Sequence, residues 1–198
     1  MQGLFPLFLK LEGRRCLVVG AGKIGQPKIA SLLGGKGTVE VIAPEATQTV
    51  RAWARDGRIR WLKRAFRDSD LDGCFLVIAA TSSRELHEEI HRLARQRGVL
   101  CNVVDVPELC DFYYPAVLKR GALQIAISTG GQSPALAHRL RKELEAQFGP
   151  EYEDWLAELG EVRRRIRAGN GKTTEKNARL HASASEESFQ QFLKGRNK

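Results

Sequence analysis

The residues best suited to chemistry begin with a glycine-rich turn, GAGKIG, at residues 20–25. Its spacing is GxGxxG, and it lies between an apolar run and a helical pattern. In such a turn Gly20 permits a tight bend, Gly22 lets the backbone approach a pyrophosphate, and Gly25 lets helix and strand pack closely. The amides and the positive dipole of the following helix then favour phosphate groups. In this context the motif predicts dinucleotide binding, although a merely tight turn is the alternative.

An acidic residue that binds the ribose is expected at the end of the second strand, about 20 residues after the glycines. That strand, TVEVIA at 38–43, is expected to close at Pro44. Glu40 lies inside it and Glu45 lies past Pro44, so neither has the standard position. No arginine lies between them to bind a 2′-phosphate. The sequence therefore favours NAD over NADP.

Asp105 ends the segment CNVVD, which we predict to be a central strand of the sheet. Ligands bind at the carboxyl ends of strands in open parallel sheets, so an aspartate there is a candidate general base. The alternative is an aspartate that forms a turn before Pro107. Position alone leaves both interpretations open.

The segment HEEIH at 87–91 matches the zinc-binding pattern HExxH. Two histidines at i and i+4 could share a metal, with Glu88 activating water, so a zinc hydrolase is a rival function. Charged residues surround both histidines, however, and no further histidine motif follows. We interpret the segment as the charged flank of a helix and expect no metal.

The chain of 198 residues has a formal charge of +9, which favours an acidic partner. Residues 51–64 interleave basic side chains with Trp53 and Trp61, but we interpret them as a solvated face and expect no nucleic acid. No apolar stretch reaches the roughly 18 residues that span a bilayer, so we expect no membrane partner. The opening segment does not resemble a signal peptide. Four cysteines without a CxxC motif indicate reduced thiols and a cytoplasmic protein.

Apolar runs alternate with helical patterns through the first half of the chain. Strands are expected at 16–20, 38–43, 58–61, 75–80 and 99–104, the third nearer a sheet edge because it alternates polar and apolar residues. Helices are expected at 24–33, at 47–56 and after a capping box formed by Ser82 and Glu85. This order predicts an α/β fold, a Rossmann-type parallel sheet with right-handed crossovers.

The pattern changes after Pro107. Residues 112–118 and 123–129 indicate a β-hairpin, and Ser133 with Pro134 indicates the start of a helix. A second helix is expected around 155–166, and the polar run 169–188 is expected to be flexible. We predict three parts: an NAD-binding domain at 1–112, a small α+β dimerisation module at 113–149, and a helical segment with a flexible tail at 150–198. A hairpin this small cannot bury its own faces, which favours a homodimer.

Three segments together resemble the precorrin-2 dehydrogenase family, which includes the dehydrogenase/ferrochelatase part of sirohaem synthases. They are LFPLFLKLEGRRCLVVGAGKIG, FLVIAATSS and CNVVDVPELCDFYYPAVLKRGALQIAISTGGQSPALAHRLRKELE, and the resemblance covers residues 1 to about 150. It implies an oxidoreductase that uses NAD to oxidise precorrin-2 to sirohydrochlorin, in sirohaem (porphyrin) biosynthesis. It also implies a homodimer built through the hairpin module. Some members insert iron or cobalt, and the sequence leaves that chelatase activity open.

The resemblance also implies roles for single residues. Asp105 matches the essential aspartate of the family, and Lys23, Ile24, Pro44 and Glu45 match its nucleotide contacts. The turn and the helix start near 130 offer amides for the carboxylates of the tetrapyrrole substrate. The substrate residues expected there are Ser128, Thr129, Gly130, Gly131, Ser133 and Arg139, with Arg141 nearby.

Residues 151–198 match no motif, and no methyltransferase domain is recognised. A rival of another class is a non-catalytic Rossmann module that senses a dinucleotide and regulates a partner. The block from CNVVD to STGGQSP separates the two functions, because a pure sensor does not need it.

Overall fold

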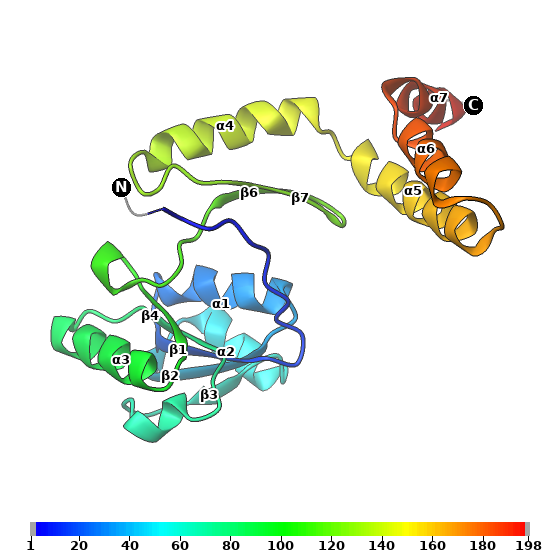
Figure 1. Cartoon of the computed structure of the whole chain (residues 1–198). Helices are drawn as coiled ribbons and strands as arrows, with labels where there is room; N and C mark the ends of the chain where they lie inside the picture. Colours follow the sequence, from blue (N-terminus) through cyan, green and yellow to red (C-terminus); the bar gives the residue numbers. More distant parts are fainter. Residues whose placement is uncertain (1–2, 197–198) are drawn as a thin grey trace. The chain divides into compact units, whose positions relative to one another are not determined.

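A computed structural model describes residues 3–196 of the chain. The chain forms two compact units, which divide between Tyr113 and Tyr114 and are described separately below. Figure 1 shows the path of the chain through both. Within the described range, no helix is both long enough and apolar enough to cross a membrane.

The first unit is built on a five-stranded parallel sheet with the strand order β3-β2-β1-β4-β5. The strands are β1 (Arg15–Ala21), β2 (Thr38–Ala46), β3 (Arg60–Leu62), β4 (Leu76–Ala79) and β5 (Leu100–Val103). The strands β1 and β4 are almost fully buried, and β2 is buried from Val39 to Ala43, which explains their largely apolar sequences. The expected Rossmann-type α/β fold is confirmed, as is the edge position of the third strand.

Helices cover both faces of this sheet (Figure 1). The crossovers carry α1 (Gly25–Gly34), α2 (Gln48–Arg55) and α3 (Arg84–Gln96), with the short 3₁₀ helix η1 (Asp68–Leu71) between β3 and β4; a second 3₁₀ helix, η2 (Pro107–Leu109), follows β5. Ile90, Leu93 and Ala94 of α3 pack with alternate strand residues such as Leu17 and Val77. Because side chains alternate across a strand, the neighbouring strand residues face α1, which contacts β1 and β2.

Three local expectations about this unit are wrong. The strand that precedes Asp105, β5, lies at the sheet edge rather than at its centre. The second strand does not close at Pro44 but continues to Ala46; the register slips opposite Gly20, and this irregularity accommodates a residue without an N–H. The helix α3 is capped by Ser83, whose Oγ accepts from the Leu86 amide at 3.2 Å, and not by Ser82.

The second unit begins with the predicted hairpin, β6 (Ala116–Arg120) and β7 (Leu123–Ile127). Gly121 has φ +54° in the two-residue turn, a conformation that favours glycine. The helix α4 (Pro134–Gln147) packs on the hairpin, and Ser133 caps it, with Pro134 at its first position as predicted. Arg120 donates to the carbonyl of Phe148 at 2.9 Å and so satisfies the end of α4.

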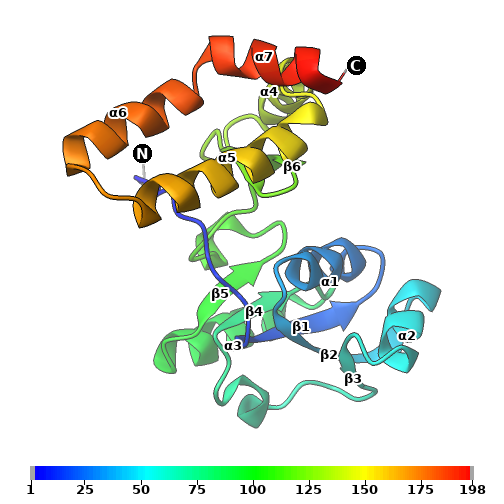
Figure 2. The ribbon, with the colours of Figure 1, turned by 90° about the vertical axis from the view of Figure 1, so that its right-hand side faces the viewer.

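Three further helices complete this unit: α5 (Glu151–Ala168), α6 (Thr173–Ser183) and α7 (Glu186–Arg196). Figure 2 shows α5 beside the α6–α7 pair. The polar run expected to be flexible therefore forms helices instead. The physical reason is an aromatic cluster beyond that run: Tyr152 and Trp155 of α5 lie 4.6 and 4.7 Å, by ring centroids, from the buried Phe189 of α7. Packing of α7 on α5 holds the polar segment between them in place.

Candidate functional site

The glycine turn lies at the carboxyl end of β1 and leads directly into α1. Gly20 has φ +104°, and a Cβ on it would lie 2.2 Å from the carbonyl oxygen of Ala80. A Cβ on Gly25 would lie 2.2 Å from the carbonyl oxygen of Gly20. A Cβ on Gly22 would meet nothing within 4 Å. Two glycines therefore serve the fold, whereas Gly22 borders open space, as close approach of a ligand requires.

The start of α1 fits a bound pyrophosphate. The helix has no acidic residue in its first turn, and no side chain caps its N-terminus. The positive end of its dipole is therefore left uncompensated by the helix itself. Lys23 and Ile24 are exposed at this end, Ile24 by 54%. The positions expected to contact the nucleotide thus lie at the surface of the glycine turn.

Pro44 and Glu45 lie at the carboxyl end of β2, next to the glycine turn because β1 and β2 are paired. Both are exposed, and Glu45 forms an ion pair of 3.0 Å with Arg51 of α2. Glu40 is different: it is buried and bound to Arg15 at 2.8 Å and to Arg60 at 3.2 Å. Glu40 therefore links β1, β2 and β3. Glu45 is the acidic residue at the carboxyl end of β2, beside the glycine turn.

Asp105 follows the carboxyl end of β5, and so lies at the same end of the parallel strands as the glycine turn. β5 is two strands from β1, and a spacing of about 4.8 Å puts it about 10 Å away. Asp105 is exposed and has φ +62°, in the left-handed region that few non-glycine residues adopt. Aspartate is among the residues that tolerate this region, and such outliers are concentrated at functional sites.

Lys28 is a residue of this site that sequence reasoning missed. It lies in α1, one turn after Gly25, and is half-buried. Burial lowers the pKa of the Lys28 ammonium, and the negative charge of Asp105 opposes that shift. The helix that follows the glycine turn therefore brings a cation into the electrostatic range of Asp105. The signal for it was a lysine one helical turn past the motif.

Thr81 is a second missed residue. It follows β4, and its backbone nitrogen would lie 3.3 Å from a Cβ on Gly20. Its buried Oγ1 has no hydrogen-bond partner among the described residues. The first unit thus brings the glycine turn, Thr81, Pro44, Glu45 and Asp105 to one edge of the sheet.

The expected substrate residues gather in the second unit, at the turn between β7 and α4. Gly130 and Gly131 have φ +61° and +82°, so two left-handed residues in succession form the turn. The hydroxyls of Ser128, Thr129 and Ser133 accept the amides of Gly130, Ser133 and Leu136 at 3.1–3.2 Å. Arg139 pairs with Glu143 at 2.9 Å on the exposed face of α4. The three hydroxyls therefore maintain the turn.

The two remaining sequence motifs, the HEEIH segment at 87–91 and the basic run at 51–64, lie in the first unit. His87 is buried on α3, and its Nε2 has no hydrogen-bond partner among the described residues. In residues 3–196 no three His, Cys, Asp or Glu side chains are grouped so that they could hold a metal ion. In the basic run, Trp61 donates to the Ala43 carbonyl at 2.9 Å, and Arg64 pairs with Asp70 at 2.6 Å. That no metal and no nucleic acid bind remains a prediction.

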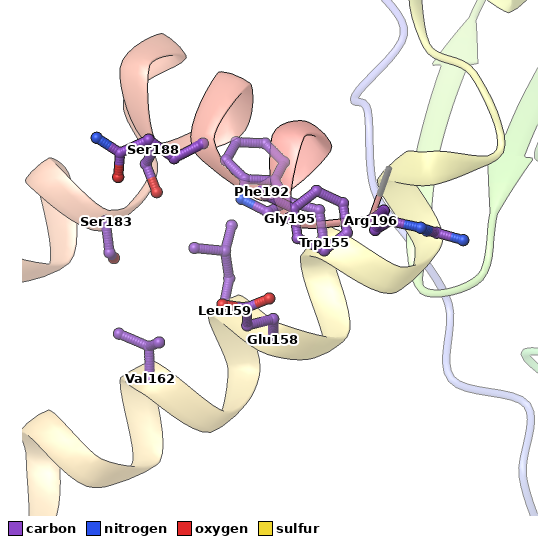
Figure 3. A pocket seen from close by; sticks show the side chains of 10 residues that line it. Trp155, Glu158, Leu159, Val162, Ser183, Ser188, Phe192, Gly195 and Arg196 are labelled. Carbon is purple, nitrogen blue, oxygen red and sulfur yellow. The ribbon is translucent and has the colours of Figure 1, made fainter. Parts of the chain in front are cut away.

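A hollow of about 490 Å³ lies between α5 and α7 of the second unit. Figure 3 shows Trp155, Leu159 and Phe192 on its walls, with Glu158 and Arg196 beside them. None of the residues predicted to act in catalysis or binding lines it. It is a gap between packed helices and not part of the candidate site.

Comparisons with known proteins match both units. A sequence-family model described as putative NAD(P)-binding matches residues 7–116, and one described as sirohaem biosynthesis protein central matches residues 120–147. The siroheme synthase of Nitrosococcus oceani is 39% identical over 163 residues, and that of Methylobacillus flagellatus is 40% identical over 162. Each alignment covers 82% of this chain and 34% or 35% of the relative, so the chain spans about a third of their length.

A solved structure of SirC, a precorrin-2 dehydrogenase, matches with a TM-score of 0.79 and 26% identity. The match covers 96% of this chain and 100% of that chain. It therefore includes the C-terminal helices, which carry no motif in the sequence.

Proposed function

This chain belongs to the NAD(P)-binding family whose model spans residues 7–116, and from that premise we propose that it is an NAD-dependent precorrin-2 dehydrogenase. The resemblance to the precorrin-2 dehydrogenase family, inferred from the three sequence segments, is confirmed. In the proposed reaction, precorrin-2 loses a hydride and a proton, and sirohydrochlorin, NADH and a proton are formed.

One observation carries the proposal. The structural match spans the whole SirC chain and nearly all of this one, so no segment of that dehydrogenase lacks a structural counterpart here. The alignments cover only about a third of the curated siroheme synthases, and their full set of activities is not proposed for this chain.

The residues at the sheet edge suit an oxidation of this kind. NAD, when bound, accepts the hydride. The open space at Gly22 and the uncapped start of α1 would receive its pyrophosphate, and Glu45, near the carboxyl end of β2, is the residue proposed to bind the ribose. Asp105 is the proposed base, because an ionised carboxylate can accept the proton that leaves as the macrocycle gains a double bond. Exposure keeps that carboxylate accessible to a large substrate.

The charge of the chain suits a substrate with many carboxylates. The formal charge of +9 attracts polyanions. The Gly130–Gly131 turn and the start of α4 offer further amides, and Arg139 lies in the second turn of the helix. We assign these residues to substrate binding. Metal insertion remains a prediction of the family resemblance.

The proposal includes a homodimer formed through residues 113–149. Support comes from apolar side chains left exposed on this module, Val117 by 42% on β6 and Leu136 by 38% on α4. Light scattering at micromolar concentration should give a mass twice that of one chain. Leu136→Glu should lower the measured mass. A monomeric wild-type protein would remove this part of the proposal.

The proposal places the protein in the cytoplasm. All four cysteines are free, and burial raises the pKa of the Cys16 and Cys74 thiols to about 11 and of the Cys101 thiol to about 12. Thiols of this kind are unreactive and suit a reducing compartment.

The test is a direct assay. Purified protein is mixed with NAD and precorrin-2 under anaerobic conditions, and sirohydrochlorin is followed by its absorbance together with NADH. We expect both products in equal amounts, and neither without NAD. A folded protein that binds NAD but forms no sirohydrochlorin would contradict the function and favour the rival dinucleotide sensor.

A further inference from the structure

The loop that carries Asp105 leaves β5 and returns to it. At its base, the backbone of Asp111 donates to the Cys101 carbonyl at 2.8 Å, and the Asp111 carboxylate accepts the Cys101 amide at 2.9 Å. The Asn102 side chain donates to the carbonyl of Phe112 at 2.7 Å. The free side of this edge strand is therefore used to close a short loop over residues 103–110.

The thiol of Cys110 fills the inside of that loop. Its Sγ lies 3.1 Å from the Val103 carbonyl oxygen and 3.3 Å from that of Val106. The side-chain Nδ2 of Asn102 donates to the same sulfur at 3.4 Å. Burial raises the pKa of the Cys110 thiol, so it keeps its proton at neutral pH and can donate it.

These contacts surround the strained residue. The Val106 amide donates to the Val103 carbonyl at 3.3 Å, which makes residues 103–106 a turn with Asp105 third. A positive φ at that position favours glycine, and Asp105 has φ +62°. A residue held in this backbone conformation persists only where its surroundings over-determine it. The sulfur contacts both ends of this turn.

We propose that Asn102 and Cys110 form a clip that positions the Asp105 carboxylate for the reaction. The inference rests on the proposed function, in which Asp105 is the base. Neither residue touches the reacting atoms: Asn102 is buried within β5 and faces away from the α3 side of the sheet, and Cys110 lies inside the loop. Both are positioning residues, which act through Asp105.

Cys74 provides a matched control. It is half-buried like Cys110, and its Sγ donates to the Asp70 carbonyl at 3.2 Å. It lies just before β4, at the amino-terminal ends of the parallel strands, whereas the candidate site lies at their carboxyl ends. Loss of its thiol removes the same kind of hydrogen bond without touching the Asp105 loop.

The first measurement is turnover. Cys110→Ala should lower kcat by about tenfold to a hundredfold, because a misplacement of about 1 Å can cost that much, with the KM for NAD unchanged. Cys110→Ser, which keeps a donor, should recover most of the loss, and Cys74→Ala should match the wild type. In an Asp105→Asn background, Cys110→Ala should have no further effect on kcat. An equal loss in both backgrounds, or an equal loss for Cys74→Ala, would overturn the clip.

The second measurement does not depend on activity. The Val106 amide should exchange its hydrogen about fivefold faster in Cys110→Ala, the factor given by loss of one typical hydrogen bond, and at the wild-type rate in Cys74→Ala. Unchanged exchange in Cys110→Ala would overturn the clip. If the wild-type protein does not oxidise precorrin-2, the proposed function is wrong, and the Val106 exchange rate alone then decides whether the clip exists.

Discussion

The Thr47 hydroxyl donates a hydrogen bond to the side-chain oxygen of Gln26 at 2.7 Å, and so ties the cap of α2 to the first turn of α1. The Thr47 amide also donates to the Ala21 carbonyl at 3.0 Å. These bonds hold the segment after β2 against the glycine turn. The two parts of the candidate cofactor site, one for the pyrophosphate and one for the ribose, are therefore joined through a single threonine.

Thr47→Ala should weaken both the fold and the site. Thr47 Oγ1 also accepts the Val50 amide at 3.2 Å, and loss of such a cap costs about 1 kcal/mol of unfolding free energy. Loss of the bond to Gln26 should weaken NAD binding about fivefold, since one hydrogen bond contributes about 1 kcal/mol. Thermal unfolding and NAD titration measure the two effects. Ser185→Ala removes an equal cap, at 3.2 Å, in the second unit and should leave NAD affinity unchanged.

Gly22→Val should block the cofactor without harming the fold. A Cβ at Gly22 meets no protein atom within 4 Å, whereas it would enter the space left for a pyrophosphate. We expect the melting temperature to stay near the wild-type value and NAD affinity to fall by at least about tenfold, a loss of roughly 1.4 kcal/mol. Gly34→Val, at the other end of α1 and equally open, is the control. Retained affinity in folded Gly22→Val would show that the dinucleotide lies elsewhere.

Much of the first unit could be predicted because its signals are local. A buried parallel strand is a continuous apolar run, and the glycine turn at residues 20–25 marks both the strand end and the helix start. The position of β5 could not be predicted in this way. Apart from Asn102, its residues are as apolar as those of β4, because the Asp111 segment and α3 cover what is an edge strand. Apolar content reports burial and does not report strand order.

The sequence identified several residues of the site but not the contacts that hold them in place. The motif identified Gly22, and the resemblance singled out Asp105. Neither reveals that the backbone of Asp105 is left-handed or that Lys28 lies within electrostatic range of it. Those facts depend on contacts between segments far apart in the chain. The helices α6 and α7 were missed for a similar reason, since the polar run 169–188 is ordered by Phe189, which lies beyond it.

Glu40 should make the stability of the protein depend on pH in the acid range. The hydrogen bond from Arg15 holds the pKa of the Glu40 carboxyl below its ordinary value of 4.5. A depressed pKa in the folded state adds stability above that ordinary value, and the contribution is lost as pH falls through the lower folded pKa. Unfolding free energy should therefore fall as the pH is lowered below 4.5, and less steeply in Glu40→Gln.

At neutral pH, Glu40→Gln should cost about 2 kcal/mol, the range for hydrogen bonds to a charged group that is largely buried. Glu88→Gln is the control, because Glu88 is 56% exposed in its pair with Arg84, and exposed pairs contribute about 0.5 kcal/mol or less. Denaturant titrations between pH 3 and pH 7, roughly spanning the window set by carboxyl pKa values, measure both. Parallel pH profiles for wild type and Glu40→Gln would contradict the assignment.

Asp105→Asn should abolish most turnover while the protein still folds and binds NAD. Asparagine tolerates the left-handed backbone of Asp105 but cannot accept the departing proton. Loss of a general base costs about 10²- to 10⁴-fold in rate, so kcat should fall by that factor. Sirohydrochlorin formation, melting temperature and NAD affinity are measured on one preparation.

Two further substitutions separate chemistry from backbone strain at this position. Asp105→Gly relieves the positive φ of +62°, and Asp105→Ala worsens it, by about 1 kcal/mol or more. If Asp105 is only a turn residue, Asp105→Asn and Asp105→Gly should keep their activity per folded molecule. Asp105→Ala should then differ from the wild type mainly in stability. If it is the base, all three variants should be equally slow although their stabilities differ. Turnover that follows stability across the series would therefore assign Asp105 to the turn and leave the glycine site as the only functional part of this edge.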